Sequence, residues 1–243
     1  MQPKQPTPPF AVSATGTPQP AAAPKAGAGK APGTAFEVRQ LFPTPIALMR
    51  LPNYAAINAA LEKAILAREA EVRSVQHSNL GGWQSPHDLA SWTGEAGQAV
   101  LQTAVGLANR LTVDRAGRPI EAQWLMNAWA NVNRAGHGNE FHTHPGAYWS
   151  ATYYVRDGGC SENPALGGEF EIADPRGIAP AMLAPELAFA TKNGLSVGVN
   201  ESLSPVPGLM VMFPSWLSHG VRPYHGDDVR ISIALNLTPK YKL

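Results

Sequence analysis

The sequence predicts a mainly β protein, an antiparallel sandwich or barrel with helices packed on one sheet. Two segments with helical periodicity come first, at about 54–71 and 94–111. About eight short stretches with strand character follow them, separated by turns rich in glycine and proline. A run of helices before a run of strands favours an architecture in which the helices cover one face of an antiparallel sheet.

Composition limits the class of protein. With 243 residues and 44% hydrophobic content, the chain can bury a sizeable core within one β domain. Its 19 basic and 18 acidic residues give a net charge of +1, and so no electrostatic case for nucleic acid or an anionic membrane. The lone cysteine, Cys160, allows no intrachain disulfide, and no apolar run is long enough to span a bilayer. The N-terminus lacks the apolar stretch of a secretory signal, so we expect a cytoplasmic protein; its oligomeric state is open.

The chain divides into two parts of different composition. Residues 1–35 are mostly proline, alanine, glycine, threonine and lysine, with Phe10 as the single aromatic residue. Such a segment buries too little apolar surface to offset the entropy of ordering, so we expect a disordered N-terminal segment. Residues 36–243 are predicted to form the folded domain.

The elements follow in order. Residues 36–53 predict a strand, a break at Pro43-Thr44-Pro45 and a second strand, after which Asn53 is the expected N-cap of the first helix. The apolar stripes of the two helices are Ile57, Leu61, Ala64 and Ile65, then Leu101, Ala104, Val105, Ala108 and Leu111. Strands are expected within 121–134, 140–144, 148–157, 169–175 and 207–216, followed by a hairpin of 218–223 and 229–237 that turns at 224–228. The loops 78–87, with Trp83 and Gln84, and 156–168 are expected to cover the site and exclude water.

The stretch EFHTHPG, residues 140–146, carries the clearest chemical signal. In an extended strand, Glu140, His142 and His144 point the same way. Neutral imidazole is the commonest protein ligand for metals, and His219, after a hydrophobic strand, is a third candidate. The sequence therefore predicts a metal site of His142, His144 and His219, with Glu140 as an alternative ligand.

The stretch RISIALN, residues 230–236, suggests an anion site. Arg230, Ser232 and Ala234 alternate onto one face of the predicted strand, and no acidic residue shares that face. A guanidinium on a core strand needs a partner, and its planar fork suits a carboxylate. We expect Arg230 to bind a ligand carboxylate with help from Ser232, next to His219 across the predicted hairpin.

These motifs together resemble the iron(II)- and 2-oxoglutarate-dependent oxygenases. The likeness extends over about residues 38–239 and is strongest to a small bacterial and phage group whose defining pair is H-x-H-P. Its stretches here are LFPTP (41–45), SNLGGWQS (78–85), HTHPGAYWSATYYV (142–155), GGEFEIADPR (167–176), PGLMVMFPSWLSHGV (207–221) and RISIALN (230–236). The chain departs from the wider superfamily at His144, which stands where a carboxylate is usual, so the site has one more unit of positive charge.

The resemblance implies a fold, cofactors and roles. The fold would be a double-stranded β-helix, a cupin-like jelly-roll barrel, and the cofactors would be Fe(II), 2-oxoglutarate and O2. Tyr154 would help Arg230 and Ser232 to hold 2-oxoglutarate, and Asn127 and Asn131 would point into the barrel and bind either ligand. The activity would be a dioxygenase reaction, hydroxylation of an unidentified small-molecule or peptide substrate with release of succinate and CO2.

Two other functions are compatible with the same histidines. A three-histidine enzyme of cupin type would need the metal but not Arg230 as a carboxylate anchor. A non-catalytic β-sandwich binding module would use the histidines for a structural zinc, which favours a closed site with four ligands.

Overall fold

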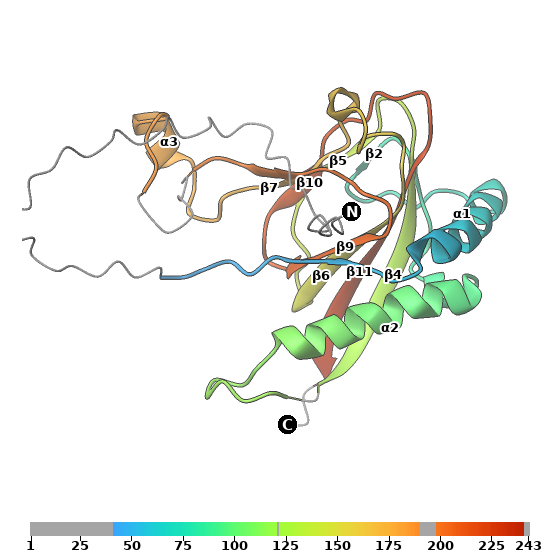
Figure 1. Ribbon diagram of the computed structural model, residues 1–243, viewed down its shortest axis with the longest axis horizontal. Helices are drawn as coiled ribbons and strands as arrows, with labels where there is room; N and C mark the ends of the chain where they lie inside the picture. The colour runs from blue at the N-terminus through green and yellow to red at the C-terminus, as the bar shows by residue number, and fades with distance from the viewer. Residues whose placement is uncertain (1–40, 121, 190–197, 241–243) are drawn as a thin grey trace, which may run out of the picture.

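The computed structural model describes residues 41–120, 122–189 and 198–240. The predicted N-terminal segment 1–35 lies outside these residues, and so do residues 36–40 of the first predicted strand, which runs from Phe36 to the break at Pro43. The described chain forms two antiparallel sheets with two long helices against one of them, so the mainly β class with flanking helices is confirmed (Figure 1). None of the described helices combines the length and the hydropathy that crossing a bilayer requires.

The larger sheet has six strands in the order β1-β9-β6-β11-β4-β3. Their bounds are β1 Ala47–Arg50, β3 Trp83–Gln84, β4 Gln123–Asn133, β6 Trp149–Asp157, β9 Leu209–Pro214 and β11 Arg230–Lys240. The smaller sheet has the order β2-β5-β10-β7-β8. Its strands are β2 Asn79–Leu80, β5 Gly138–His142, β7 Phe170–Ile172, β8 Glu201–Leu203 and β10 His219–Val221.

From β4 onward the chain passes repeatedly between the two sheets, which is how a jelly roll is built: β4, β6, β9 and β11 lie in one, and β5, β7, β8 and β10 in the other. Side chains from both inner faces pack together, for example Phe170 of β7 against Phe213 of β9, with ring centroids 5.1 Å apart. In the described part, ladder hydrogen bonds do not close the two sheets into one barrel. The fold is therefore a sandwich of two sheets whose facing side chains form one interior.

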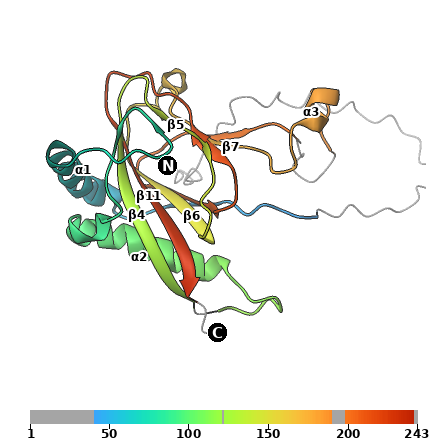
Figure 2. The same cartoon turned by 180° about the vertical axis from the view of Figure 1, so that it is seen from behind.

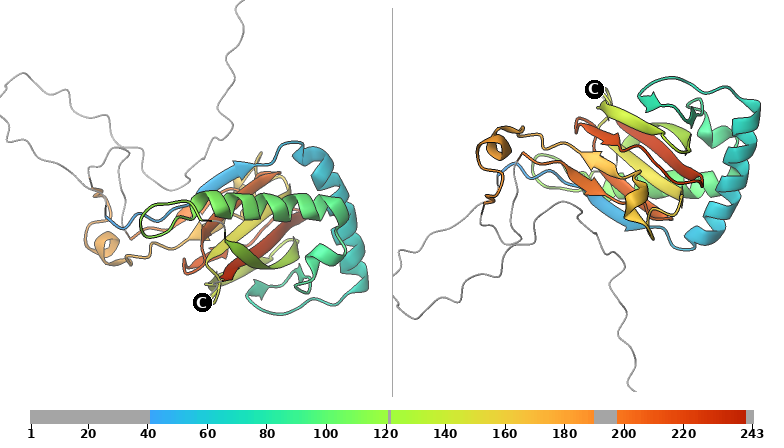
Figure 3. Two further views of the ribbon diagram at one scale, coloured as in Figure 1. Left: turned by 90° about the horizontal axis from the view of Figure 1, so that it is seen from below. Right: turned by 90° about the horizontal axis from the view of Figure 1, so that it is seen from above.

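The two long helices form where their periodicity predicted them, α1 at Tyr54–Glu71 and α2 at Gly94–Leu111. They cover the outer face of the six-stranded sheet (Figure 3). Leu61 and Ile65 of α1 and Leu101 of α2 are buried there against alternate residues of β4, β6 and β11. Because this face of the sheet is apolar, the opposite residues of the same strands are left to line the interior.

Three shorter helices complete the described fold: η1 Leu89–Ser91, η2 Pro164–Leu166 and α3 Ala179–Leu183. The segment with α3 lies between β7 and β8 and projects away from α1 and α2 (Figure 1). The sequence suggested that Trp83 lies on a loop that covers the site, but the structure places it elsewhere. It is 7% exposed in the helix-side core, and its Nε1–H donates to the Val72 carbonyl. Gln84 is likewise buried, because β3 pairs with β4.

Asn53 is the N-cap of α1, as predicted, although its side chain makes no capping hydrogen bond; it takes a left-handed conformation (φ 53°), which asparagine tolerates better than most residues. The predicted hairpin, in contrast, was wrong. The segments at 218–223 and 229–237 do not form a hairpin. β10 pairs with β5 and β7, whereas β11 pairs with β4 and β6 in the opposite sheet. The connection over 222–229 therefore crosses from one sheet to the other.

Candidate functional site

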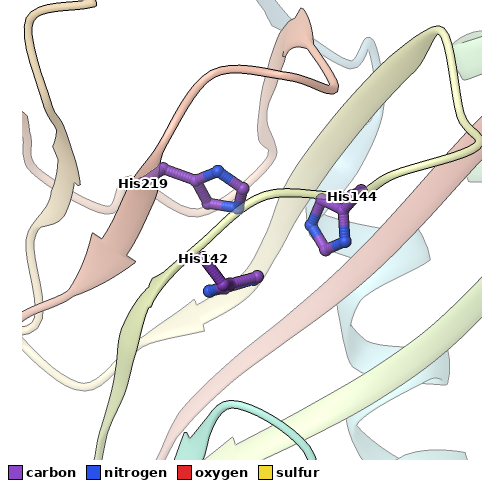
Figure 4. Close-up of side chains that lie close together, drawn as sticks. All are labelled: His142, His144 and His219. Atoms are coloured by element: carbon purple, nitrogen blue, oxygen red, sulfur yellow. The ribbon is translucent and has the colours of Figure 1, made fainter.

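A cluster of three histidines lies at one end of the interior. His142, His144 and His219 each offer a ring nitrogen, and these atoms lie within 4.8 Å of one another. Figure 4 shows the three rings gathered in one place, with His219 on β10, His142 at the end of β5 and His144 on the loop that follows β5. Glu140, the alternative ligand, is exposed and outside this group.

The backbone explains how the histidines meet. His142 ends β5 and is paired directly with His219, the first residue of β10. The sequence predicted that this strand includes His144, but β5 ends at His142. His144 lies two residues beyond β5, where its backbone N–H donates to the Ser215 carbonyl (2.9 Å), just before the turn at Pro145-Gly146. The common direction of the rings therefore comes from sheet pairing and a loop contact as well as from alternation along one strand.

Hydrogen bonds fix the tautomer of two rings. Nδ1 of His142 lies 2.7 Å from the Glu140 carbonyl oxygen, and Nδ1 of His219 lies 2.8 Å from the Leu217 carbonyl oxygen. A carbonyl can only accept, so in both rings Nδ1 carries a proton and Nε2 is the nitrogen left to bind a metal. Backbone carbonyls commonly orient metal-binding histidines in this way.

Burial keeps two rings neutral. Desolvation, aided by the neighbouring histidines, lowers the pKa of His144 to about 4 and that of His219 to about 3. Both rings are therefore unprotonated near neutral pH, as metal coordination requires. Bonds from nitrogen to a metal of about 2.0–2.1 Å need nitrogens no more than about 4.2 Å apart, so small ring rotations suffice for the set to share one ion.

Arg230 lies at the start of β11 and is 1% exposed. Within the described residues no carboxylate oxygen comes within ion-pair distance of it, and its Nε has no hydrogen-bond partner. Its contacts are Asn133 Oδ1 at 3.5 Å and the ring of Tyr154, whose centroid is 5.3 Å from Cζ. A buried cation left so poorly compensated is costly unless an anion joins it.

Tyr154 offers a second unsatisfied donor beside this cation. The residue is fully buried, and its hydroxyl has no hydrogen-bond partner. Burial raises the pKa of Tyr154, and the nearby charge of Arg230 opposes the rise, so the phenol stays protonated and able to donate. Ser232, next along the same face of β11, is 5% exposed. Unsatisfied donors around an unpaired guanidinium fit the carboxylate of a ligand.

The segment before β7 lies against Arg230, which together with Tyr154 and Ser232 is here called the anion end of the site; the three histidines are the metal end. Gly168 has φ +76°, and a Cβ there would lie 3.2 Å from Cδ and 3.3 Å from Nε of Arg230. Glu169 is 6% exposed, and its Oε2 has no partner. Cys160 is buried, with its pKa raised to about 11, chiefly by burial; Arg230 opposes this shift and Asp157 and Glu169 add to it. The thiol is therefore a neutral neighbour of the guanidinium.

The two ends are joined through packed rings. His219 contacts Phe170 and Phe213, with centroids 5.3 and 4.6 Å away. Both phenylalanines belong to the inter-sheet cluster that also contains Tyr154, which in turn contacts Arg230. Histidines from the smaller sheet and its loop, and the arginine from the larger sheet, thus face one interior.

The remaining predicted residues lie on the inner face of β4. Asn127 is exposed and paired with Asn236, and Asn131 is half-buried and paired with Ser232. Sequence reasoning missed Asn133, although the same alternation includes it, and it missed Ser78, whose hydroxyl lies 3.5 Å from Nε2 of His142. It also gave no role to Gly168 and Glu169, because only the tertiary structure brings them to Arg230.

The fold and the site together define a β-sandwich protein in which three histidines that could hold a metal share an interior with a buried arginine that has no ion-pair partner among the described residues. Residues 127–236, from β4 into β11, match the model of a family described as "Putative 2OG-Fe(II) oxygenase". The matched residues include all three histidines and Arg230, so this part of the chain is similar to the 2OG-Fe(II) oxygenases, which are enzymes that use iron(II), 2-oxoglutarate and dioxygen.

Solved structures share the fold at low sequence identity. A prolyl-4-hydroxylase from Pseudomonas putida has a TM-score of 0.57 and 18% identity, covering 81% of this chain and 93% of its own. A prolyl hydroxylase from Trichoplax adhaerens, solved with a peptide fragment of hypoxia inducible factor, has a TM-score of 0.55 and 14% identity, covering 79% and 83%. HygX from Streptomyces hygroscopicus, with nickel and 2-oxoglutarate bound, has a TM-score of 0.52 and 11% identity, covering 82% and 84%. The predicted double-stranded β-helix is thus confirmed, while no curated protein sequence matches the chain significantly.

Proposed function

We propose that the protein is a dioxygenase that hydroxylates a small-molecule or peptide substrate and releases succinate and CO2. The observation that carries the proposal is that a cluster of three histidines and a buried arginine without an ion-pair partner among the described residues face one interior. When bound, iron(II) and 2-oxoglutarate supply the chemistry: one atom of O2 enters a substrate C–H bond, and the other enters succinate as CO2 leaves.

The histidines are proposed to hold the metal. Nε2 of His142 and Nε2 of His219 are the lone pairs left free by the backbone hydrogen bonds, and His144 completes the set. Three protein ligands leave open positions on a metal ion, which distinguishes this set from a closed structural zinc site.

The anion end is proposed to hold the distal carboxylate of 2-oxoglutarate. Arg230 would donate through its guanidinium, and Tyr154 through its hydroxyl, so that the unsatisfied donors in the interior gain an acceptor. Ser232 lies on the same face for a further hydrogen bond, and Asn131 and Asn127 lie further along β4. A cupin-type enzyme or a binding module with structural zinc would leave the buried cation unexplained.

Anaerobic titration of the iron(II) protein with 2-oxoglutarate tests the proposal. We expect a visible charge-transfer band that needs both components and that Arg230→Ala abolishes while iron binding is retained. His225→Ala is the matched control, because His225 is exposed on the loop between β10 and β11 and outside the cluster. Metal binding without a band in the unaltered protein would contradict the proposal, and so would a band that survives Arg230→Ala.

Succinate formation with candidate substrates tests the second half of the proposal. Turnover above the uncoupled background, with one hydroxyl gained per succinate, is the expected result. Turnover that never exceeds background with any metabolite or peptide pool would count against hydroxylation.

A further inference from the structure

The inner face of the two longest strands, β4 and β11, extends beyond the three histidines and Arg230. The outer end of this face, here called the neutral strip, consists of Leu125, Asn127, Trp129 and Asn131 of β4 with Ala234, Asn236 and Thr238 of β11. Their neighbours Ala128, Ala130, Ile233, Leu235 and Leu237 are buried on the helix side, so the strip faces the other way. β4 and β11 lie side by side and antiparallel, and β11 ends near the C-terminus (Figure 2).

None of the residues of the neutral strip is charged. Arg230 lies at the inner end of the same face, and Lys240 lies at the outer end of β11. A substrate with a fixed charge over the strip would lose hydration there without gaining an ionic partner from it, which costs free energy. The strip therefore favours an uncharged ligand.

A line of rings leads from the histidine cluster to the surface along this strip. The ring of Trp129 lies 6.0 Å from that of His144, and the ring of His87 lies 4.7 Å from that of Trp129. His77 stacks on His87 at 5.7 Å, with 22° between the planes. Trp129 is 8% exposed, whereas both of these histidines are exposed.

The segment after β3 fixes the outer rings beside Trp129. The Ser85 backbone N–H donates to the Ala130 carbonyl, and Asp88 forms a bridge with Ala128. His87 lies between these two attachments and is therefore held over β4. Flat rings of this kind bind other rings by offset or edge contacts.

The length and the polar groups of the strip suit a chain better than a small metabolite. From Trp129 to Gln123 the strand extends about 20 Å, at about 3.4 Å per residue. The side-chain amides of Asn127 and Asn236 face each other across the ladder, and Ser150 Oγ donates to Asn236 Oδ1, which leaves the Asn236 amide N–H groups to donate. Side-chain amides offer both a donor and an acceptor, which match those of a peptide group.

From these observations we propose that the neutral strip binds an uncharged, extended peptide segment. The residue presented to the histidine cluster carries an apolar ring, which packs against Trp129 and His87. This inference deepens the proposed function and rests on it, since it names the class of substrate for the same site.

The test measures binding and needs no turnover. The full chain is loaded with Ni(II) and 2-oxoglutarate and titrated with Ac-Gly-Ala-X-Ala-Gly-NH2, where X is Pro, Phe, Asp or Lys, while saturation-transfer NMR reports binding. We expect at least one of the two peptides with an apolar ring, X = Pro or X = Phe, to bind more tightly than both the Asp and the Lys peptides. Trp129→Leu should weaken that binding by about two- to tenfold, the range of a lost ring contact, while Trp129→Phe should retain most of it.

The controls separate the strip from the rest of the site. His225→Ala should bind the peptides as the unaltered protein does, and Trp129→Leu should bind 2-oxoglutarate normally. Equal binding of charged and uncharged peptides, or unchanged binding by Trp129→Leu, would overturn the inference. If N-acetyl-X N-methylamides bind as tightly as the pentapeptides, the strip takes a small neutral molecule and the peptide assignment is wrong. If 2-oxoglutarate does not bind, the proposed function fails, and the peptide titrations still decide whether the strip binds peptides.

Discussion

The metal end and the anion end of the site differ in how many of their hydrogen bonds are formed without a ligand. At the metal end, Nδ1 of His142 and of His219 already donates to a backbone carbonyl. At the anion end, Arg230 Nε and the Tyr154 hydroxyl have no partner. The first end is set up by hydrogen bonds that exist before any ligand arrives, whereas the second is completed only by a ligand. A site of imidazoles oriented by backbone carbonyls can be built in advance at low cost, but a buried cation keeps its desolvation cost until an anion binds.

The largest expected effect is at the metal end. His219→Ala removes one of three ligands, and we expect metal affinity to fall by at least about 100-fold, beyond the 10- to 100-fold typical of losing a group that only orients a ligand. Calorimetric titration with a divalent metal measures it, with His225→Ala as control. Unchanged affinity would show that the three rings do not share an ion.

At the anion end, removing the key side chain is expected to leave the stability of the ligand-free protein unchanged or to raise it. Arg230→Met removes an uncompensated buried charge, so the ligand-free protein should be as stable as the unaltered chain or more stable by about 1 kcal/mol. Urea unfolding measures this. The same variant should no longer be stabilised by 2-oxoglutarate in the presence of metal. A large loss of stability would mean that the cation is already compensated.

A smaller effect is expected where the backbone approaches Arg230. In Gly168→Ala the new Cβ would meet Cδ and Nε of Arg230 at 3.2 and 3.3 Å, in a left-handed conformation that alanine disfavours. Displacement of the guanidinium should weaken 2-oxoglutarate binding by about tenfold, equivalent to about 1.4 kcal/mol. Gly117→Ala is a matched control, since Gly117 also has positive φ but nothing lies within 4 Å of its added Cβ.

Acidification should act on the metal end of the ligand-free protein. The pKa values of His144 and His219 are lowered to about 4 and about 3, so between the ordinary value of 6.5 and these values the unfolded chain binds more protons than the folded one. Stability should therefore fall as the pH drops from about 6.5 toward 4. Unfolding of His219→Gln across this range should show a shallower dependence. An equal slope would place the effect elsewhere.

The smallest effect separates the two sets of ligands considered from the sequence. Glu140 is exposed and only its backbone carbonyl contacts His142, so Glu140→Gln should change metal affinity by less than about twofold, because the amide keeps that backbone contact. A loss comparable to that of His219→Ala would make Glu140 a ligand.

The sequence by itself determined the local features of this protein. Periodicity predicted both long helices with their observed bounds, α1 at 54–71 and α2 at 94–111, because the apolar stripe of a helix is written within a few turns of chain. Alternation likewise predicted that Ile231 and Ile233 face away from Arg230, and the pair His142-x-His144 suggested a metal site.

Only the tertiary structure decided how these local features are arranged in space. A strand pairs with segments far from it in the sequence, so nothing near residues 218–237 revealed that β10 and β11 lie in opposite sheets. The same non-local packing placed His144 on a loop, brought Gly168 to Arg230 and stacked His87 on Trp129. Residue types and their spacing determine which chemistry is possible. Contacts between segments far apart in the chain determine which groups share a site.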